Sequence, residues 1–349
     1  MNYGSAESIY SLRQIIRTGA EWVEIVPTEY QDGFLDITTK YGTFTASALS
    51  DIISIIDYAK SRGMKVFLKP QILVGATGSS SGVGDISDDA LLNQWFFDYE
   101  AFVLKYATIA SMSNVDMYSV STNLNAAMAD SRLQERWANL LKKVKEIYRN
   151  KLVVVLDASN TNYFAVKWVK DSVNINAIGF DTYKIKEFAV LLNVSKTIST
   201  LKTDIKAKIF ADVANFIGSS GKQVYMTGYG ACSGDCLTNP LPSPTLANLT
   251  VSSSAKYMAS YANVQKNFTL AFAQAAYEFT GDNNVKISGV FLWGWLTDTK
   301  FGNQADNDCY SLQGKTSYDG IYQAFRDGKV LYSLGATAGT TECGCVTDS

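Results

Sequence analysis

Acidic side chains stand at the ends of several predicted strands, and these groups are the best suited of the chain to acid–base chemistry. Glu29, Asp157 and Asp181 each follow or end a strand-like run. Two carboxyl groups in different environments can divide the roles of proton donor and base or nucleophile between them. The alternative for Asp157 and Asp181 is a structural hydrogen bond that closes the end of the strand. Histidine is absent from the chain, which excludes histidine triads, histidine bases and histidine metal sites.

The composition is that of an ordinary globular protein. The chain has 349 residues, of which 47% are hydrophobic and 18% charged, so a large core can form. The net charge of −2 gives nucleic-acid binding no electrostatic support. No apolar stretch has the length of a membrane span, and Met1 is followed directly by polar sequence without a recognisable signal peptide. We predict no cofactor.

The five cysteines indicate disulfide bonds in an oxidising compartment. All lie late in the chain, at Cys232, Cys236, Cys309, Cys343 and Cys345. Cys232 and Cys236 flank a short turn and could pair locally, and the odd count leaves one thiol free or intermolecular. A zinc site would need four well-spaced ligands, which this spacing does not offer. Glycosylation sequons at Asn193, Asn248 and Asn267 agree with secretion, in which case the chain is a mature form.

Strand-like and helical segments alternate along the chain. The predicted strands are 22–28, 65–70, 117–120, 152–156, 177–180, 224–226 and 289–295. The clearest predicted helices are 5–18, 48–62, 90–110, 133–149 and 259–279. Near-continuous apolar strands that alternate with helices form parallel sheets covered on both faces. Seven such units in series favour a closed α/β barrel of the (β/α)8 type, the TIM barrel.

The barrel is expected to occupy residues 1–335, followed by a short, polar, cysteine-containing tail at 336–349. Two Gly/Ser- or Pro-rich segments, 75–89 and 240–254, are predicted to be long loops on the ligand-binding face or plain surface insertions. Seven strands leave one barrel position unfilled, and unpaired strand edges favour aggregation. The spare strand-like run 329–334, or a strand of a neighbouring chain, could fill it. Alternatively, an N-terminal first strand is absent from this chain.

Several segments, in order along the chain, resemble glycoside hydrolase family 113, the endo-β-mannanase type of the large retaining-glycosidase clan. The segments that carry the resemblance are Trp22–Asp32, Gly63–Gln71, Trp95–Glu100, Ile178–Tyr183 and Gly289–Trp295. The resemblance implies a TIM barrel with catalytic glutamates at the ends of the fourth and seventh strands. At those two places this chain has Asn123 and Gly228. The Lys-Pro-His step of the family is Lys69-Pro70-Gln71 here, and the acidic Glu29 replaces an aromatic-like position.

These replacements predict a secreted glycoprotein that keeps the glycosidase fold without catalysing hydrolysis. An amide at Asn123 cannot deliver a proton at neutral pH, and Gly228 supplies no nucleophile. We therefore expect a glycan-binding role, or a structural or adhesive role with homotypic protein contacts. The alternative is an active retaining endo-β-mannanase that uses relocated carboxylates from Glu29, Asp157 and Asp181. A tyrosine nucleophile at Tyr229 has no specific support.

The residues expected to contact a glycan stand at the predicted carboxyl ends of the strands. Aromatic side chains can stack on the C–H faces of sugars, although the same rings could instead fill the barrel core. Lys69 is expected to donate hydrogen bonds and not to act as a catalytic amine, because no Schiff-base context is visible. The predicted glycan-binding residues are Lys69, Gln71, Asn123, Asp181, Tyr183, Tyr229, Trp293 and Trp295.

Overall fold

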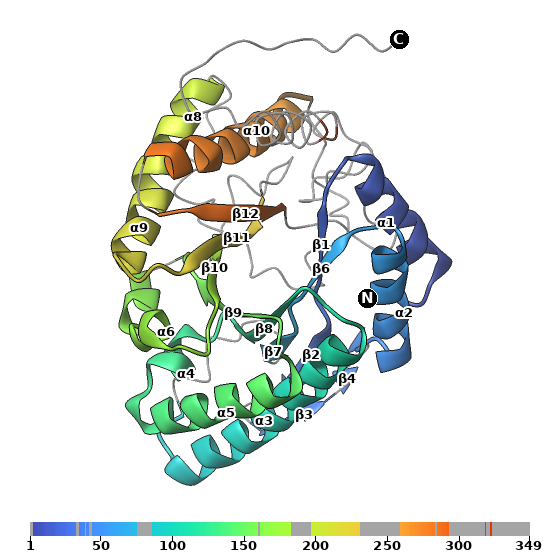
Figure 1. The fold of residues 1–349 in the computed structure, drawn as a ribbon, viewed down its shortest axis with the longest axis vertical. Coiled ribbons are helices and arrows are strands. Elements are labelled where there is room, and N and C mark those ends of the chain that lie inside the picture. The colour runs from blue at the N-terminus through green and yellow to red at the C-terminus, as the bar shows by residue number, and fades with distance from the viewer. Residues whose placement is uncertain are drawn as a thin grey trace.

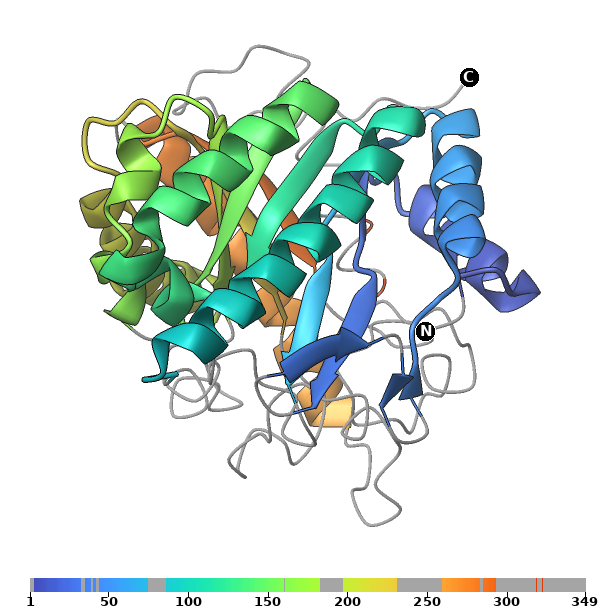
Figure 2. The same cartoon turned by 90° about the horizontal axis from the view of Figure 1, so that it is seen from below.

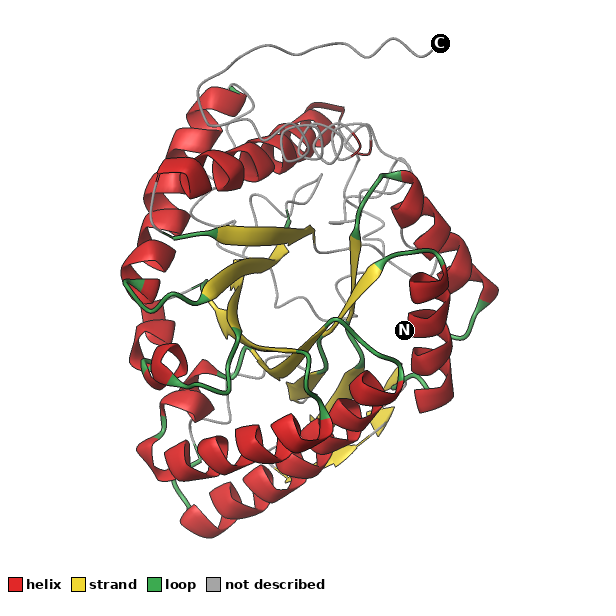
Figure 3. Ribbon diagram, in the orientation of Figure 1, coloured by secondary structure: helices red, strands yellow, loops and turns green. Residues whose placement is uncertain are grey.

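The fold is a nearly closed barrel of parallel strands surrounded by helices (Figures 1 and 3). The computed structural model of the protein describes residues 3–32, 35–38, 40–41, 44–74, 86–159, 161–182, 197–230, 259–282, 285–292, 318 and 322. Within these ranges the main sheet has seven strands in the order β1-β6-β8-β9-β10-β11-β12. Each pairs in parallel with the next. The predicted TIM-barrel architecture is therefore confirmed.

The seven barrel strands coincide with the seven runs predicted from the sequence. Their bounds are β1 Trp22–Ile25, β6 Lys65–Leu68, β8 Met117–Thr122, β9 Lys151–Asp157, β10 Ala177–Thr182, β11 Gln223–Tyr229 and β12 Ile287–Leu292. β1 and β12 stand at the two ends of this sheet in the described part of the chain. Trp22 and Phe291 meet edge to face across these two ends, with ring centroids 6.2 Å apart. The run 329–334 and the tail lie outside the described residues.

The helices form an outer ring around the strands (Figure 3). Their bounds are α1 Ala6–Arg17, α2 Leu49–Ser61, α3 Asp89–Met112, α4 Asn125–Ala129, α5 Gln134–Ile147, α6 Trp168–Asp171, α8 Ile198–Ile205, α9 Ala211–Ile217 and α10 Ala259–Asp282. Shorter turns of 3-10 helix lie at Ser131–Leu133 and Thr161–Ala165, and a π-helical turn joins α8 to α9 at Lys206–Phe210. Among the described residues, none of the helices is long and apolar enough to cross a membrane.

Helix ends follow local chemistry that the sequence already contains. Ser5 caps α1 by accepting a hydrogen bond from the Ser8 amide, and Asp88 caps α3 through the amides of Ala90 and Leu91. Gly63, with φ of +79°, follows the last residues of α2, where a left-handed conformation favours glycine. These signals explain why the predicted and observed helix bounds agree closely.

The segment predicted as one strand from Trp22 to Thr28 divides into two. β1 ends at Ile25, and the chain passes Pro27 before β2 (Thr28–Asp32) begins. β2 lies in a separate sheet between β3 (Leu35–Thr38) and β7 (Gln71–Val74). A further short hairpin joins β4 (Lys40–Tyr41) to β5 (Phe44–Thr45). Figure 2 shows these small strands at one end of the barrel. Proline cannot donate a ladder hydrogen bond, which explains the break.

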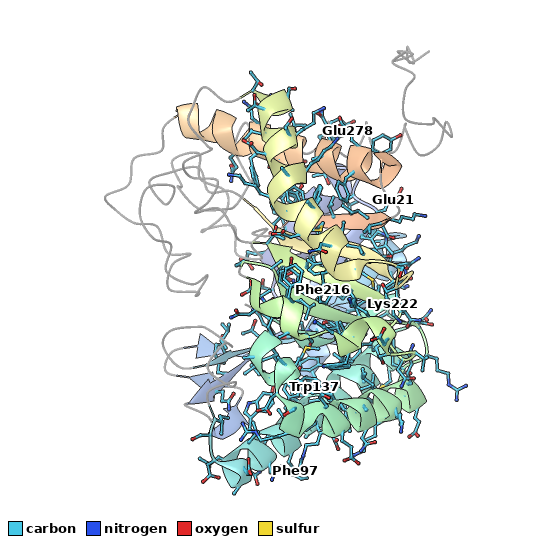
Figure 4. The ribbon with its side chains drawn as sticks, turned by 90° about the vertical axis from the view of Figure 1, so that its left-hand side faces the viewer. Glu21, Phe97, Trp137, Phe216, Lys222 and Glu278 are labelled. Atoms are coloured by element: carbon cyan, nitrogen blue, oxygen red, sulfur yellow. The ribbon has the colours of Figure 1, made fainter. Side chains whose placement is uncertain are left out.

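The core has one layer between helices and strands and a second inside the barrel. In the outer layer, Trp137 of α5 is completely buried and contacts Phe96 and Tyr99 of α3, whereas Phe97 of α3 is 67% exposed (Figure 4). The inner layer is a separate apolar cluster of Phe67, Met117, Val153, Val155, Ala177, Tyr225 and Phe291, with Trp22 packed against it. This mainly apolar cluster packs inside the barrel, between the strands.

Candidate functional site

The centre of the candidate site is Lys69, the first residue after β6. Its side chain is 2% exposed, and its ammonium nitrogen lies 2.8 Å from Glu24 Oε1 and 3.1 Å from Asp181 Oδ1. The same nitrogen donates to the carbonyl oxygen of Thr227 at 2.8 Å. A lysine ammonium has three protons, so these three acceptors use its full donor capacity. Residues from β1, the end of β6, β10 and β11 thus converge on one nitrogen inside the barrel.

Asp181 is the most completely hydrogen-bonded carboxylate of the site. It is 1% exposed. Its Oδ1 atom accepts from the hydroxyl of Thr227 at 2.7 Å, and its Oδ2 atom accepts from Asn123 Nδ2 at 3.1 Å. Lys69 Nζ lies 3.1 Å and 3.2 Å from the two oxygens. Four contacts from three residues hold this carboxylate in place.

The placement of Thr227 depends on a bulge and on a missing side chain. Phe180 is paired with Met226, but the next residue, Asp181, is paired with Gly228, so β11 has one extra residue at Thr227. A Cβ atom at Gly179 would lie 2.7 Å from Thr227 Cγ2 and 2.9 Å from its Oγ1. Only glycine at 179 leaves Thr227 the space from which it reaches Asp181.

Asn123, at the end of β8, has a left-handed backbone with φ of +58°. Asparagine tolerates this conformation better than most residues. Its backbone N–H donates to the carbonyl of Val155, and the Thr122 hydroxyl donates to the carbonyl of Pro70 at 2.9 Å. The end of β8 is therefore tied to both neighbouring strands, which directs the Asn123 side chain towards Asp181. The structure thus brings together three of the predicted residues, Lys69, Asn123 and Asp181.

Glu24 was not predicted from the sequence. It lies on β1 opposite Phe67 of β6, and its side chain is 11% exposed. Burial raises the pKa of Glu24 to about 7. The positive charge of Lys69 lowers this pKa, and the negative charge of Asp181 raises it, but burial has the largest effect. For Lys69, burial lowers the pKa, but the charges of Asp181 and Glu24 outweigh it and the net shift is upward. The sequence signal that could have found Glu24 is its two-residue spacing from Trp22, which points it into the barrel.

The other two predicted acids have local partners. Glu29 on β2 is 2% exposed and binds Lys105 Nζ at 2.6 Å and the Tyr106 hydroxyl at 2.8 Å, both from α3. Asp157, at the end of β9, accepts from the Ser159 amide at 2.7 Å. Both arrangements resemble structural interactions that fix an element. Glu29 contacts α3, and Asp157 binds a residue two positions along the chain and is paired with Asp181 in the strand register.

The remaining predicted glycan-binding residues separate into two groups. Tyr229 is 1% exposed and stacks on Phe272 of α10, with ring centroids 3.8 Å apart and planes at 11°. It therefore packs between sheet and helix, and burial raises its pKa. Gln71 donates to the Thr28 hydroxyl at 3.0 Å. Tyr183, Trp293 and Trp295 lie outside the described residues.

The residues predicted for covalent modification are mostly outside the described part of the chain. This applies to Cys232, Cys236, Cys309, Cys343, Cys345, Asn193 and Asn248. Asn267 lies within α10 and is partly exposed. Its glycosylation remains a prediction.

Comparison with known proteins agrees with this geometry. The family model described as Glycoside Hydrolase Family 113 matches residues 1–223. A solved β-1,4-mannanase of that family is similar with a TM-score of 0.65 and 21% identity, over 93% of this chain and 94% of its own. A family 113 β-mannanase from Alicyclobacillus acidocaldarius has a TM-score of 0.63 and 16% identity, over 93% of each chain. No curated protein matches the chain.

A more distant likeness extends beyond that family. A family 5 mannosidase from Rhizomucor miehei has a TM-score of 0.61 at 10% identity, over 94% of this chain and 89% of its own. At such identities the structural matches show a shared fold, the TIM barrel.

Proposed function

Because the chain belongs to glycoside hydrolase family 113, we propose that it is a secreted member of that family which binds a β-linked, mannan-type saccharide without hydrolysing it. The substrate class follows the solved relatives, which are β-mannanases. The secreted, disulfide-bonded and glycosylated state rests on the cysteines and sequons of the sequence.

The observation that carries the proposal is the position of the Lys69 ammonium between two carboxyl groups. Retaining glycosidases hold their two carboxyl groups roughly 5–5.5 Å apart, on either side of the reacting anomeric carbon. Here Glu24 and Asp181 both bind Lys69 directly, so a cation lies between them where a substrate atom would need to lie. All three side chains are almost fully buried.

The two positions at which the family resemblance implies catalytic glutamates support the same conclusion. Asn123 uses its amide to donate to Asp181, and Gly228 has no side chain. Neither residue can exchange a proton or attack an anomeric carbon. The polar framework of the strand ends remains, and hydroxyl-rich ligands suit such a framework because each sugar hydroxyl can both donate and accept a hydrogen bond.

The test measures binding and turnover on the same preparation. Titration calorimetry with manno-oligosaccharides reports binding, and the release of reducing ends from β-1,4-mannan reports hydrolysis. We expect binding without release. The proposal fails if wild-type protein releases reducing ends, or if it binds none of the mannan-type saccharides.

One observation favours an active hydrolase as the second candidate. Glu24 Oε1 and Asp181 Oδ1 lie 2.8 Å and 3.1 Å from one nitrogen, so they are separated by no more than the sum of these distances, about 6 Å. A Glu24 pKa of about 7 also suits a general acid at neutral pH. If Lys69 moved aside on substrate binding, these two acids would form a relocated pair.

The two candidates differ in how turnover responds to substitution. For a hydrolase, Asp181→Asn abolishes the release of reducing ends, whereas Glu29→Gln, which changes a buried carboxylate bound to α3, leaves it intact. For a binding protein, neither the wild type nor either variant releases reducing ends. Circular dichroism on all three proteins establishes that they are folded.

A further inference from the structure

The second carboxylate oxygen of Glu24 distinguishes this residue from its two charged neighbours. Oε1 binds Lys69, but Oε2 is enclosed and has no hydrogen-bond partner among the described residues. Lys69 has used its three donors, and both oxygens of Asp181 accept hydrogen bonds. Of the charged groups of Glu24, Lys69 and Asp181, it is therefore Glu24 Oε2 that can accept a further hydrogen bond.

An enclosed carboxylate oxygen without a donor is costly. Buried polar atoms in proteins are almost always satisfied by protein groups, by water or by a ligand. Lys69 holds Glu24 through its other oxygen, so the residue cannot turn away without losing its ion pair. The site thus has a fixed acceptor for which the described residues supply no donor, and a bound ligand can supply one.

A saccharide hydroxyl meets this need. Hydroxyl groups donate well to carboxylates, and such charge-assisted hydrogen bonds are stronger than neutral ones. An anionic ligand would be repelled, because Glu24 and Asp181 together outweigh the single charge of Lys69. We propose that Glu24 is the ligand-binding carboxylate of this site, and that its Oε2 atom accepts a hydrogen bond from a hydroxyl of a bound neutral saccharide. This inference rests on the proposed glycan-binding function. It adds to that function one residue that contacts the ligand directly.

The inference implies that binding strengthens as the pH rises through neutrality. Among the described residues, the titratable groups around Glu24 are Lys69 from the end of β6, Asp181 from β10 and the phenol of Tyr3 before α1. The phenol oxygen of Tyr3 accepts from the backbone N–H of Val26. In the free protein the pKa of Glu24 is about 7. A hydroxyl donor stabilises the ionised carboxylate, so binding releases a proton from the fraction of molecules in which Glu24 is protonated.

The experiment measures the affinity for manno-oligosaccharides at several pH values between 6 and 8, for the wild type and Glu24→Gln. For the wild type we expect the affinity to rise about tenfold across this range, following the ionised fraction of Glu24. For Glu24→Gln we expect an affinity that is independent of pH and about tenfold weaker at pH 8. Glu29→Gln is the matched control, because it replaces a buried carboxylate of β2 that contacts α3, and it keeps the wild-type profile.

A second measurement needs no variant. Calorimetry of the wild type at pH 7 in two buffers with different ionisation enthalpies gives the number of protons released on binding, and we expect a value near one half. Binding that is independent of pH, releases no proton and is unchanged in Glu24→Gln overturns the inference and leaves the proposed function intact. Absence of binding at every pH overturns both.

Discussion

Asp181 on β10 lies directly opposite Gly228 on β11 in the parallel register of the two strands. The position expected to supply a nucleophile therefore lies beside a buried carboxylate that Lys69, Asn123 and Thr227 hold in place. Asn123, at the other position expected to be acidic, donates to the same Asp181. Asn123 and Gly228, the two positions without the expected glutamates, thus both adjoin Asp181. The hydrogen bonds that hold Asp181 therefore occupy the place where the two glutamates are expected.

Restoring both glutamates is predicted to produce hydrolysis. In the double variant Asn123→Glu, Gly228→Glu, two carboxyl groups return to the strand ends from which the family resemblance implies catalysis. Gly228 does not have a positive φ, so its backbone accepts an L residue. We expect release of reducing ends from β-1,4-mannan by the double variant, and none from the wild type or from either single variant.

The control for this prediction is Asn123→Gln, Gly228→Gln, which adds nearly the same volume without acid groups. It should be inactive. A folded double glutamate variant without activity contradicts the prediction. The new carboxyl at position 228 lies near Asp181, so a lower melting temperature is expected for the double glutamate variant.

The stability of the protein is predicted to fall as the pH rises from about 4.5 to 7. The folded-state pKa of Glu24 is raised above its ordinary value of 4.5, so its contribution to stability is fully present below pH 4.5 and is lost as the pH rises to about 7. The shift corresponds to about 3 kcal/mol in the free energy of unfolding. Denaturant unfolding of the wild type and Glu24→Gln at each pH isolates this effect, because other groups cancel.

The expected result is that Glu24→Gln becomes progressively more stable than the wild type as the pH approaches 7. Two curves that stay parallel between pH 4.5 and 8 contradict it. Glutamine keeps the size of the side chain and avoids a buried charge, so the variant is expected to fold.

The sequence predicted the barrel because its strands and helices carry strong local signals. The run Leu152–Leu156 is continuously apolar, and the helix before Gly63 ends at a residue suited to positive φ. The division of the segment 22–28 at Pro27 was not predicted, since β-branched residues continue on both sides. The pairing of β2 with β7 begins where the backbone N–H of Gln71 donates to the carbonyl of Pro27, a tertiary contact between segments distant in the sequence.

The site was predicted in part for a similar reason. Lys69 and Asp181 follow or end apolar strands, and such positions meet at the carboxyl end of a barrel. Glu24 was missed because an acidic residue in a short strand usually faces solvent, and its burial depends on Lys69 and Asp181, which are distant in the sequence. Glu29 has the same local pattern, but it contacts α3 and not the barrel centre.

Removal of the central cation is predicted to destabilise the protein strongly. Lys69→Met leaves Glu24 and Asp181 buried without a positive charge between them. Removing one partner of a buried ion pair typically costs about 3–5 kcal/mol. We expect denaturant unfolding at pH 7 to show a loss of this size, and the loss to shrink at lower pH as the carboxyl groups take up protons. Adding Glu24→Gln to Lys69→Met should restore part of the stability. A loss below about 1 kcal/mol contradicts the prediction.

Tyr229 is predicted to contribute to stability and not to ligand binding. Its ring stacks on Phe272 in the layer between sheet and α10. Tyr229→Ala should cost about 3–5 kcal/mol, as for other buried aromatic truncations, whereas Tyr229→Phe keeps the stack. We expect Tyr229→Phe to bind manno-oligosaccharides with wild-type affinity. Reduced affinity of that variant with unchanged stability would instead place the phenol in contact with the ligand.

Gly179 is predicted to be essential for the geometry around Asp181. In Gly179→Ala the new methyl group would lie 2.7 Å from Thr227 Cγ2 and 2.9 Å from Val155 Cγ2, so Thr227 must shift and its 2.7 Å hydrogen bond to Asp181 is lost or lengthened. Overpacking of this kind costs about 1–3 kcal/mol, measurable by thermal or denaturant unfolding.

The second-site variant Thr227→Ser separates crowding from other effects of alanine at position 179. Serine lacks the Cγ2 atom that makes the closest contact but keeps the hydroxyl that donates to Asp181. We therefore expect Gly179→Ala, Thr227→Ser to regain part of the stability that Gly179→Ala loses, with Thr227→Ser alone as the reference. Independent, additive losses in the double variant would mean that the two positions do not compete for the same space, since additivity is the behaviour of residues that do not interact.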